Sequence, residues 1–222
     1  MRQSSSKYTT RFVAGVTLAL GAAWGAHAAQ GDAQAGADKA AMCIGCHGIP
    51  GYQNAFPEVY KVPKISGQSA KYIESALTAY HKGERKHPTM RGVAGSLSEQ
   101  DIADLAAFYG SQSNGVTLPE TANPAPEAVA ALLNKGGCVA CHGANFSKPL
   151  DPSYPKIAGQ HPDYLYAALK AYTVKGNDMV GRGNAIMGGV AQQFSHAEMK
   201  AMAKYLASLP GEVFTQPLNR FR

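Results

Sequence analysis

Two five-residue segments contain every cysteine of the chain and share the pattern Cys-x-x-Cys-His. This spacing is typical of c-type haem attachment, in which two thiols form thioethers to one porphyrin and the adjacent histidine binds the iron. The pattern therefore predicts two covalently bound haem c groups. The residues expected to hold them are Cys43 and Cys46 with the iron ligand His47, and Cys138 and Cys141 with the iron ligand His142.

Other chemistries use paired cysteines as well. A thioredoxin-like redox motif has the same C-x-x-C spacing, but it belongs in a βαβ pattern rich in β-branched residues, which this chain lacks. Zinc also binds cysteine and histidine. Neither alternative requires a histidine directly after the second cysteine, and roughly 0.002 such pentapeptides are expected by chance in a chain of this composition. Two matches favour haem.

The second axial ligand is expected to be a methionine. A thioether on the far side of the iron favours the ferrous state and raises the reduction potential. Met90 follows His47 by 43 residues and Met187 follows His142 by 45. Each is expected in a glycine-containing loop, seven residues before a Leu-Ser or Phe-Ser pair that starts the last helix of its unit. Met179 is a second candidate in the later loop, but it lacks that spacing.

The N-terminus has the features of a cleaved secretory signal. Three basic residues precede a short apolar stretch at 12–24, and Ala26-His27-Ala28 is a small-residue cleavage site. The stretch is too short and too rich in glycine and alanine for a membrane span. We expect residues 1–28 to be removed and the protein to be periplasmic, because haem is attached to this motif outside the cytoplasm.

The charge of the chain gives no indication of nucleic-acid binding. The formal net charge is +6, and the signal peptide contains three basic groups and no acidic ones, so the mature chain carries +3. Four haem propionates would nearly cancel this charge. Basic and acidic residues are interleaved, as on an ordinary solvated surface.

The mature chain is an internal duplication at domain scale. Pro63–Gln68 (PKISGQ) recurs as Pro155–Gln160 (PKIAGQ), and a tyrosine-containing segment follows each copy at the same offset of 92 residues. We expect domains at 29–113 and 124–222, joined by a polar linker at 114–123.

Each unit is expected to be helical. The predicted helices cover Asp32 to Ala41, Gln68 to His81, Pro126 to Lys135 and Gln160 to Tyr172, and capping-box patterns at Ser98 and Ser195 predict the start of the last helix in each unit.

Two further features are candidates for supporting the haems. A proline has no N–H group, and the carbonyls of Pro63 and Pro155 are candidates to accept a hydrogen bond from the proximal imidazole, although simple turn formation also explains these prolines. Arg85 and the repeated tyrosines are candidates for hydrogen bonds to haem propionates.

Taken together, these motifs closely resemble those of the dihaem cytochrome c4 family over essentially the whole mature chain. The resemblance implies an all-α fold of two tandem class I cytochrome c domains related by a pseudo-twofold axis. It implies Cys43, Cys46, Cys138 and Cys141 as haem attachment sites, with the axial pairs His47 and Met90, and His142 and Met187. It also implies periplasmic electron transfer in a respiratory chain, commonly towards a terminal oxidase, with peripheral membrane association possible.

Two other functions remain open at this stage. A cytochrome subunit of a periplasmic dehydrogenase has the same haem chemistry with an obligate partner, and redox encounters use small interfaces that leave little mark in a sequence. A dihaem peroxidase needs an open iron position. If methionine closes both irons, the protein is an electron carrier rather than an enzyme. Its expected partners are then redox proteins, either an upstream electron donor or a terminal oxidase.

Overall fold

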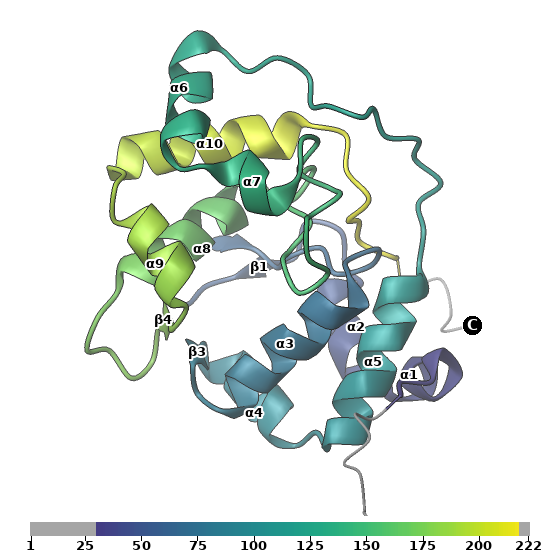
Figure 1. Ribbon diagram of the computed structural model, residues 1–222. Helices are drawn as coiled ribbons and strands as arrows, with labels where there is room; N and C mark the ends of the chain where they lie inside the picture. Colours follow the sequence, from purple (N-terminus) through teal and green to yellow (C-terminus); the bar gives the residue numbers. More distant parts are fainter. Residues whose placement is uncertain (1–29, 218–222) are drawn as a thin grey trace, which may run out of the picture.

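The computed structural model describes residues 30–217, and the chain is mostly helical (Figure 1). The first half contains α1 (Ala33–Lys39), α2 (Ala41–His47), β1 (Gln53–Asn54), β2 (Tyr60–Lys61), α3 (Ala70–His81), β3 (Arg85–Lys86), α4 (Pro88–Gly95) and α5 (Glu99–Ser111). The second half contains α6 (Glu127–Lys135), α7 (Cys138–His142), α8 (Pro162–Thr173), β4 (Gly181–Arg182), α9 (Ala185–Ala191) and α10 (His196–Ser208). The expected signal peptide, residues 1–28, and the end of the chain after Pro217 lie outside the described residues.

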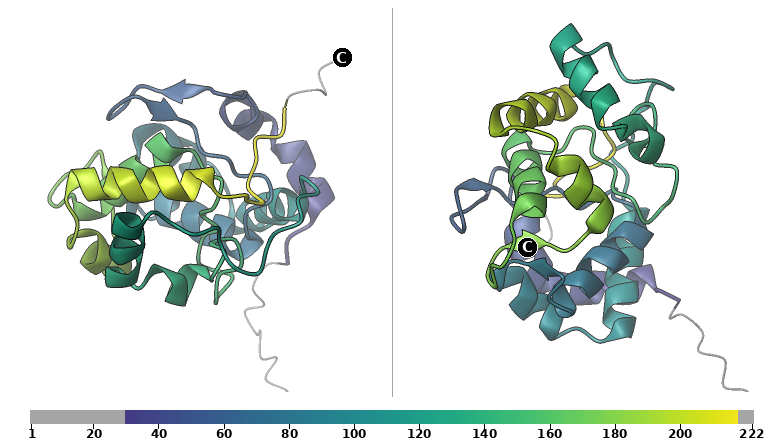
Figure 2. Two further views of the ribbon diagram at one scale, coloured as in Figure 1. Left: turned by 90° about the horizontal axis from the view of Figure 1, so that it is seen from above. Right: turned by 60° about the vertical axis from the view of Figure 1, so that its left-hand side comes forward.

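The two halves repeat one arrangement of helices around separate cores. In the first half α5 packs against α1 and α3, and in the second α10 packs against α6 and α8. Leu105 of α5 is 1% exposed and Met199 of α10 is 2% exposed, and each lies at the centre of its own cluster of buried apolar side chains. The right-hand view of Figure 2 shows one domain above the other. The predicted all-α fold of two tandem domains is confirmed, with strands of two residues each between the helices.

The last helix of each domain begins where the sequence predicts. The Ser98 hydroxyl accepts from the Asp101 N–H and the Asp101 carboxylate accepts from the Ser98 N–H, and Ser195 and Glu198 do the same at α10. Two backbone donors are satisfied reciprocally at each helix end. These caps fix where α5 and α10 begin, and both helices contribute buried side chains to the core of their domain.

Three other helix boundaries differ from the prediction by two residues. The helix expected over Asp32 to Ala41 ends at Lys39, and a turn at Ala40 separates it from α2. The middle helices begin two residues later than expected, at Ala70 and Pro162. The cause is that the buried side chains of Gln68 and Gln160 bond to the opposite domain, which holds both residues outside the helices.

The two methionines lie on helices, which corrects the expectation of irregular loops. Met90 is on α4, where the His87 ring nitrogen accepts from the Met90 N–H, and Met187 is on α9, where the Asn184 side chain accepts from the Met187 N–H. Each methionine therefore sits in the first turn of a short helix, three residues after the residue that caps it. A side chain on a capped turn is held more firmly than one on a free loop.

The domains are joined by strand pairing and by their connecting segments. β3 and β4 pair antiparallel across the interface, with Arg85 opposite Arg182. After α10 the chain crosses to the first domain, where the Phe214 N–H donates to the Ser66 carbonyl at 3.0 Å. The segment between α5 and α6 runs along the outside of both domains (Figure 1). Within residues 30–217, no helix is long and apolar enough to cross a bilayer.

Candidate functional site

Helix α2 places both thiols of the first motif on the wall of one cavity. Residues three apart are neighbours on a helix surface, and Cys43 and Cys46 both line a cavity of about 400 Å³. Neither sulfur is in a disulfide. Burial raises the pKa of the Cys43 thiol, whereas a redox-active C-x-x-C motif lowers it. This environment disfavours the thioredoxin-like alternative.

The zinc alternative lacks a ligand set. Among residues 30–217, no group of three or more His, Cys, Asp or Glu side chains is arranged to hold a metal ion.

Each motif histidine donates to a proline carbonyl. His47 Nδ1 lies 2.8 Å from the Pro63 oxygen, and His142 Nδ1 lies 3.0 Å from the Pro155 oxygen. Burial lowers the pKa of both imidazoles, so each ring is neutral at neutral pH. The proline contact then requires the proton on Nδ1, which leaves the Nε2 lone pair free to bind a metal. The carbonyl contact considered from the sequence is present in both domains.

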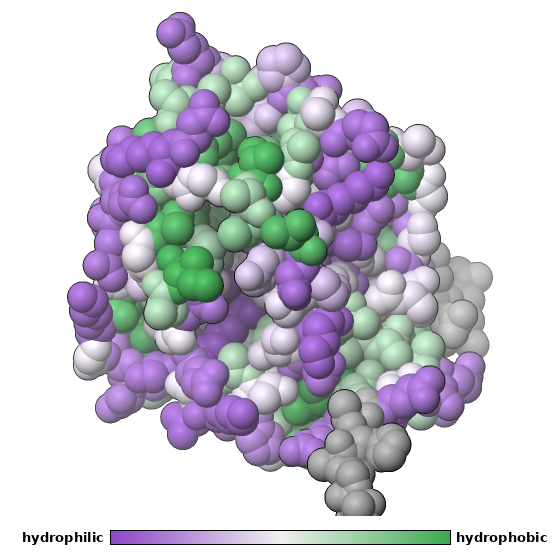
Figure 3. Space-filling model, in the orientation of Figure 1, coloured by the Kyte–Doolittle hydropathy of each residue, from purple (hydrophilic) through white to green (hydrophobic). Residues whose placement is uncertain are grey.

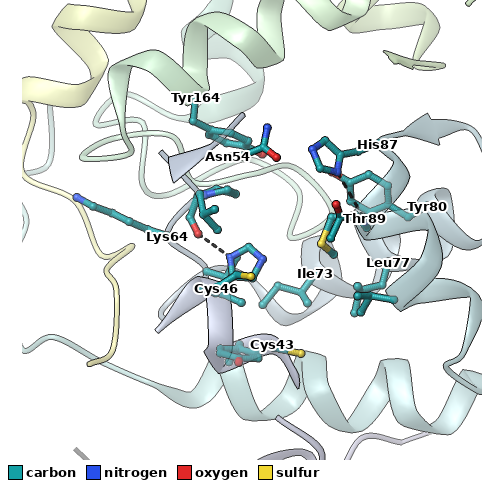
Figure 4. A pocket seen from close by; sticks show the side chains of 18 of the residues that line it. Cys43, Cys46, Asn54, Lys64, Ile73, Leu77, Tyr80, His87, Thr89 and Tyr164 are labelled. Atoms are coloured by element: carbon teal, nitrogen blue, oxygen red, sulfur yellow. Dashed lines mark hydrogen bonds between the residues drawn. The ribbon is translucent and has the colours of Figure 1, made fainter. Parts of the chain in front are cut away.

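Met90 lines the same cavity. Figure 4 shows Thr89 and His87, which precede Met90 in the sequence, across the cavity from Cys43 and Cys46. The walls between them are mostly apolar. They include Val62, Ile65, Ile73, Leu77, Val93, Leu97, Leu105 and Tyr109.

These residues fit a haem in domain 1. The cavity has the volume of a cofactor site, and it presents two thiols, a neutral imidazole and a thioether. Apolar walls suit the porphyrin faces, and both thiols line the same cavity. The donor set matches the soft and borderline ligands that haem iron uses.

The second domain presents the equivalent groups on α7 and α9. His142 is 8% exposed, and Cys138 and Cys141 precede it on the same short helix. Met187 is half-buried on α9, whereas Met179 is 52% exposed in the loop between α8 and β4. Figure 3 shows apolar side chains around a hollow on the face that carries α7 and α9. Burial distinguishes Met187 from Met179.

Two guanidinium groups meet between the domains without carboxylate partners. Within residues 30–217 their hydrogen bonds go to tyrosine hydroxyls: Arg85 to Tyr72 at 3.2 Å and Tyr164 at 2.7 Å, and Arg182 to Tyr164 at 3.0 Å. Arg85 is 9% exposed, and its Nε is buried with no hydrogen-bond partner. A buried and a half-buried cation without an anion form a site for negative groups such as haem propionates.

The cations also change the chemistry of Tyr164. Burial opposes ionisation of this phenol, but Arg182 and Arg85 outweigh that effect and lower its pKa to about 8. The two arginines therefore make the surroundings of Tyr164 positive.

Arg182 and the glutamines of the repeated motif were not identified as site residues from the sequence. Arg85 precedes Met90 by five residues and Arg182 precedes Met187 by five, so the registration that selects the methionines also pairs the arginines. The role of the glutamines depends on contacts between residues about 90 positions apart, which carry no local signal.

Comparison with known proteins agrees with this geometry. A family model described as "Cytochrome c" matches residues 29–113 and 126–210. The chain is 33% identical over 209 residues to cytochrome c4 of Stutzerimonas stutzeri, which covers 86% of this chain and 95% of that protein. The crystal structure of reduced recombinant cytochrome c4 from Pseudomonas stutzeri matches with a TM-score of 0.61 at 30% identity, over 81% of this chain and 100% of that one.

A second kind of relative is named for its partner. The chain is 32% identical over 191 residues to the thiosulfate dehydrogenase electron acceptor of Stutzerimonas stutzeri strain A1501, over 79% of this chain and 83% of that protein. With one C-x-x-C-H motif in each cytochrome c domain, the protein binds two covalent haem c groups. The chain belongs to the cytochrome c family, as a two-domain protein of the cytochrome c4 type.

Proposed function

We propose that the protein carries single electrons through two haems whose irons are each closed by histidine and methionine. The axial pairs are His47 with Met90 and His142 with Met187, and the thioethers form at Cys43, Cys46, Cys138 and Cys141. The observation that carries this proposal is that both thiols, His47 and Met90 line one mostly apolar cavity. When bound, haem supplies reversible one-electron chemistry.

The residues around that cavity suit electron transfer better than catalysis. Pro63 holds the His47 ring in the tautomer that binds a metal, and the His87 cap holds the turn that carries Met90. With a thioether on the sixth position, a substrate has no coordination site. Leu97 and Leu105 are at most 8% exposed and keep water away from the site. These features support a carrier over a dihaem peroxidase.

The chemistry of the two sites can be tested directly. Mass spectrometry of the mature chain should show two haem additions that acid-acetone extraction does not remove. The ferric protein should show a sulfur-to-iron charge-transfer band, and the reduced protein should bind carbon monoxide poorly. Extractable haem would refute covalent attachment, and rapid stoichiometric binding of carbon monoxide would refute closed irons.

Export to the periplasm is part of the proposal. The basic leader, the short apolar stretch and the Ala-x-Ala site at Ala26–Ala28 support cleavage near Ala28. N-terminal sequencing of the protein from a periplasmic extract should begin at or next to residue 29. A chain that keeps residues 1–28 would indicate an uncleaved anchor.

The partner is proposed as a respiratory redox protein, with a terminal oxidase as acceptor. A second candidate follows from the relative named as a thiosulfate dehydrogenase electron acceptor: reduction by a dehydrogenase for an inorganic sulfur compound. Stopped-flow mixing of the oxidised protein with thiosulfate and a thiosulfate dehydrogenase tests the second candidate. Fast reduction that needs the enzyme supports it, and reduction no faster than that of an unrelated cytochrome c refutes it.

A further inference from the structure

The repeated Pro-Lys-Ile-x-Gly-Gln segments form the centre of the domain interface. The Gln160 side-chain amide pairs with the backbone of Lys64: the Lys64 N–H donates to Gln160 Oε1 at 3.0 Å, and Gln160 Nε2 donates to the Lys64 carbonyl at 2.9 Å. Gln68 makes the same two contacts with Lys156, both at 2.9 Å. Each domain thus inserts one glutamine into the motif of the other.

The peptide groups that receive these glutamines are the ones that orient the proximal histidines. The Pro63 carbonyl accepts from His47 Nδ1, and the N–H of that same peptide unit, on Lys64, donates to Gln160. In domain 2 the unit formed by Pro155 and Lys156 accepts from His142 and donates to Gln68. One planar amide therefore links each histidine to the glutamine of the opposite domain.

Hydrogen bonds at the two ends of an amide strengthen one another. An acceptor at the N–H draws electron density towards the carbonyl, which makes that oxygen a better acceptor. The effect is larger where water is excluded, and Gln68 and Gln160 are each 4% exposed. The contact to each glutamine consequently strengthens the hydrogen bond that the opposite histidine donates.

The glutamine amides are also held in the required orientation. Each Nε2 donates to a lysine carbonyl, so each Oε1 must face the lysine N–H. The lysine side chains add two hydrogen bonds between the repeated motifs: Lys64 Nζ donates to the Gly159 carbonyl at 2.6 Å, and Lys156 Nζ donates to the Gly67 carbonyl at 2.8 Å. Gly67 has φ of +77°, and a Cβ there would lie 2.3 Å from the Glu212 carbonyl oxygen, which explains the glycine of the first motif.

We propose that Gln160 is a positioning residue for the iron of domain 1 and Gln68 for the iron of domain 2. Each acts across the interface, through a peptide unit, on the histidine of the other domain. A stronger bond from Nδ1–H makes the imidazole a more basic ligand and favours ferric iron. The inference rests on the proposed function, in which His47 and His142 bind the irons.

The test uses crossed substitutions in the full-length protein with both haems attached. Gln160→Met keeps the length of the side chain and removes both hydrogen bonds. We expect it to raise the reduction equilibrium constant of the domain 1 haem by about 3- to 10-fold, where tenfold equals 59 mV for a one-electron couple, and to leave the domain 2 haem unchanged. Gln68→Met should have the mirrored effect. The potentials are assigned to each haem by NMR-monitored redox titration.

A second readout separates tuning from loss of packing. In the reduced protein the Nδ1 proton resonance of His47 should move upfield in Gln160→Met and stay downfield in Gln160→Glu, which keeps an acceptor at the Lys64 N–H. Ser69→Ala is the matched control, because the Ser69 hydroxyl donates to the Pro152 carbonyl across the same interface without touching a peptide unit bonded to histidine. It should leave both potentials and both resonances in place.

Three outcomes would overturn the inference: a shift confined to the haem of the mutated domain, an equal shift of both haems that Gln160→Glu does not reverse in domain 1, or unchanged His47 and His142 resonances. None of them affects the proposed function, which stands or falls on the charge-transfer band and on closure to carbon monoxide. If Gln160→Met opens the interface as a whole, both haems shift together, and Gln160→Glu, which restores the acceptor, must restore the domain 1 potential for the inference to survive.

Discussion

Domains 1 and 2 hold their motif histidines in the same way but present their methionines differently. The imidazole to proline contacts are 2.8 and 3.0 Å long, and both peptide units bond to a buried glutamine of the opposite domain. On the methionine side, His87 caps α4 and Asn184 caps α9. The connection from α3 to α4 covers residues 82–87, and that from α8 to α9 covers 174–184.

The extra length in domain 2 contacts domain 1. Lys86 Nζ donates to the Asn177 carbonyl at 2.7 Å, and the Gly183 N–H donates to the Glu84 carbonyl at 2.7 Å. The contacts that orient the histidine are therefore the same in both domains. The segments that lead to the methionines differ, and the longer one in domain 2 forms part of the interface. The pairing of β3 with β4 connects the two methionine segments directly.

The largest expected difference concerns the methionines. Met187→Ala should open the domain 2 haem to carbon monoxide and lower its reduction equilibrium constant by about 10³-fold or more, which is 59 mV per tenfold step. Met90→Ala should do the same in domain 1. Each substitution leaves the other haem closed, because the domains have separate cores. Carbon monoxide titration counts the open irons.

Met179→Ala is the control for this assignment. Its side chain is 52% exposed, so its removal should open neither haem. If Met179→Ala opens the second haem and Met187→Ala does not, the registration of the two methionine segments is wrong.

The next difference is in potential, and we expect the domain 1 haem to have the higher one. Arg85 is buried beside the domain 1 cavity, and Lys82, Lys86 and Arg91 lie nearby in the sequence. Positive charge favours the reduced iron, and burial reduces solvent screening. Arg85→Gln should lower the reduction equilibrium constant of the domain 1 haem about tenfold, which lowers its potential by about 59 mV.

Lys82→Gln, at an exposed position, should change the same potential far less. A redox titration with assigned haems that gives domain 2 the higher potential would show that hydrogen bonding or burial outweighs charge.

A smaller difference separates the two interface lysines. Lys156 donates to Gly67 and also forms an ion pair with Glu212, whereas Lys64 donates to Gly159 and burial lowers its pKa. Lys156→Met should lower the free energy of unfolding by about 2 kcal/mol, since it also leaves Glu212 unpaired. Lys64→Met should cost about 1 kcal/mol or less, because it removes a charge that burial already disfavours.

Urea titration of each variant gives both values. Lys71→Met, which removes an exposed pair with Glu74, should change stability by less than about 0.5 kcal/mol. Equal losses for Lys64→Met and Lys156→Met would show that the Glu212 pair contributes nothing.

The sequence predicted the features that depend on residues close together in the chain or on a repeated spacing. The haem motifs, the serine caps of α5 and α10 and the offset between the two domains all follow from residues a few positions apart or from a repeated spacing. The proline carbonyls were identified because the absence of an N–H is a property of the residue itself.

Contacts between distant segments explain what the sequence did not predict. Gln68 and Gln160 fall outside their expected helices because each bonds to the other domain. Arg182 gains its role only when β4 lies beside β3. Glycines around both methionines suggested loops, but the caps at His87 and Asn184 and packing against α3 and α8 produce short helices.

The smallest expected difference is in acid stability, and it arises from the first helix of each domain. In domain 1, α1 is tied to α5 by Asp104, which accepts from the Asp32 N–H at 2.8 Å and from Lys39 Nζ at 2.7 Å. These contacts, with Gln100, lower the pKa of Asp104 to about 2. In domain 2 the lysine at the end of α6, Lys135, donates to the Gln193 carbonyl instead of a carboxylate.

The lowered pKa fixes the sign of the pH dependence. An unfolded aspartate has a pKa near 3.9, so the stabilisation is complete above about pH 4 and is lost as the pH falls to about 2. Asp104→Asn should therefore lower the melting temperature at pH 7, and this difference from the unmodified protein should shrink towards pH 2. Glu198→Gln is a control at a helix-capping carboxylate of domain 2, and it should have little effect because glutamine preserves the capping box. Calorimetry at several pH values gives both profiles. A constant Asp104→Asn difference from pH 7 to pH 2 would mean that Asp104 stabilises α1 through packing rather than through its charge.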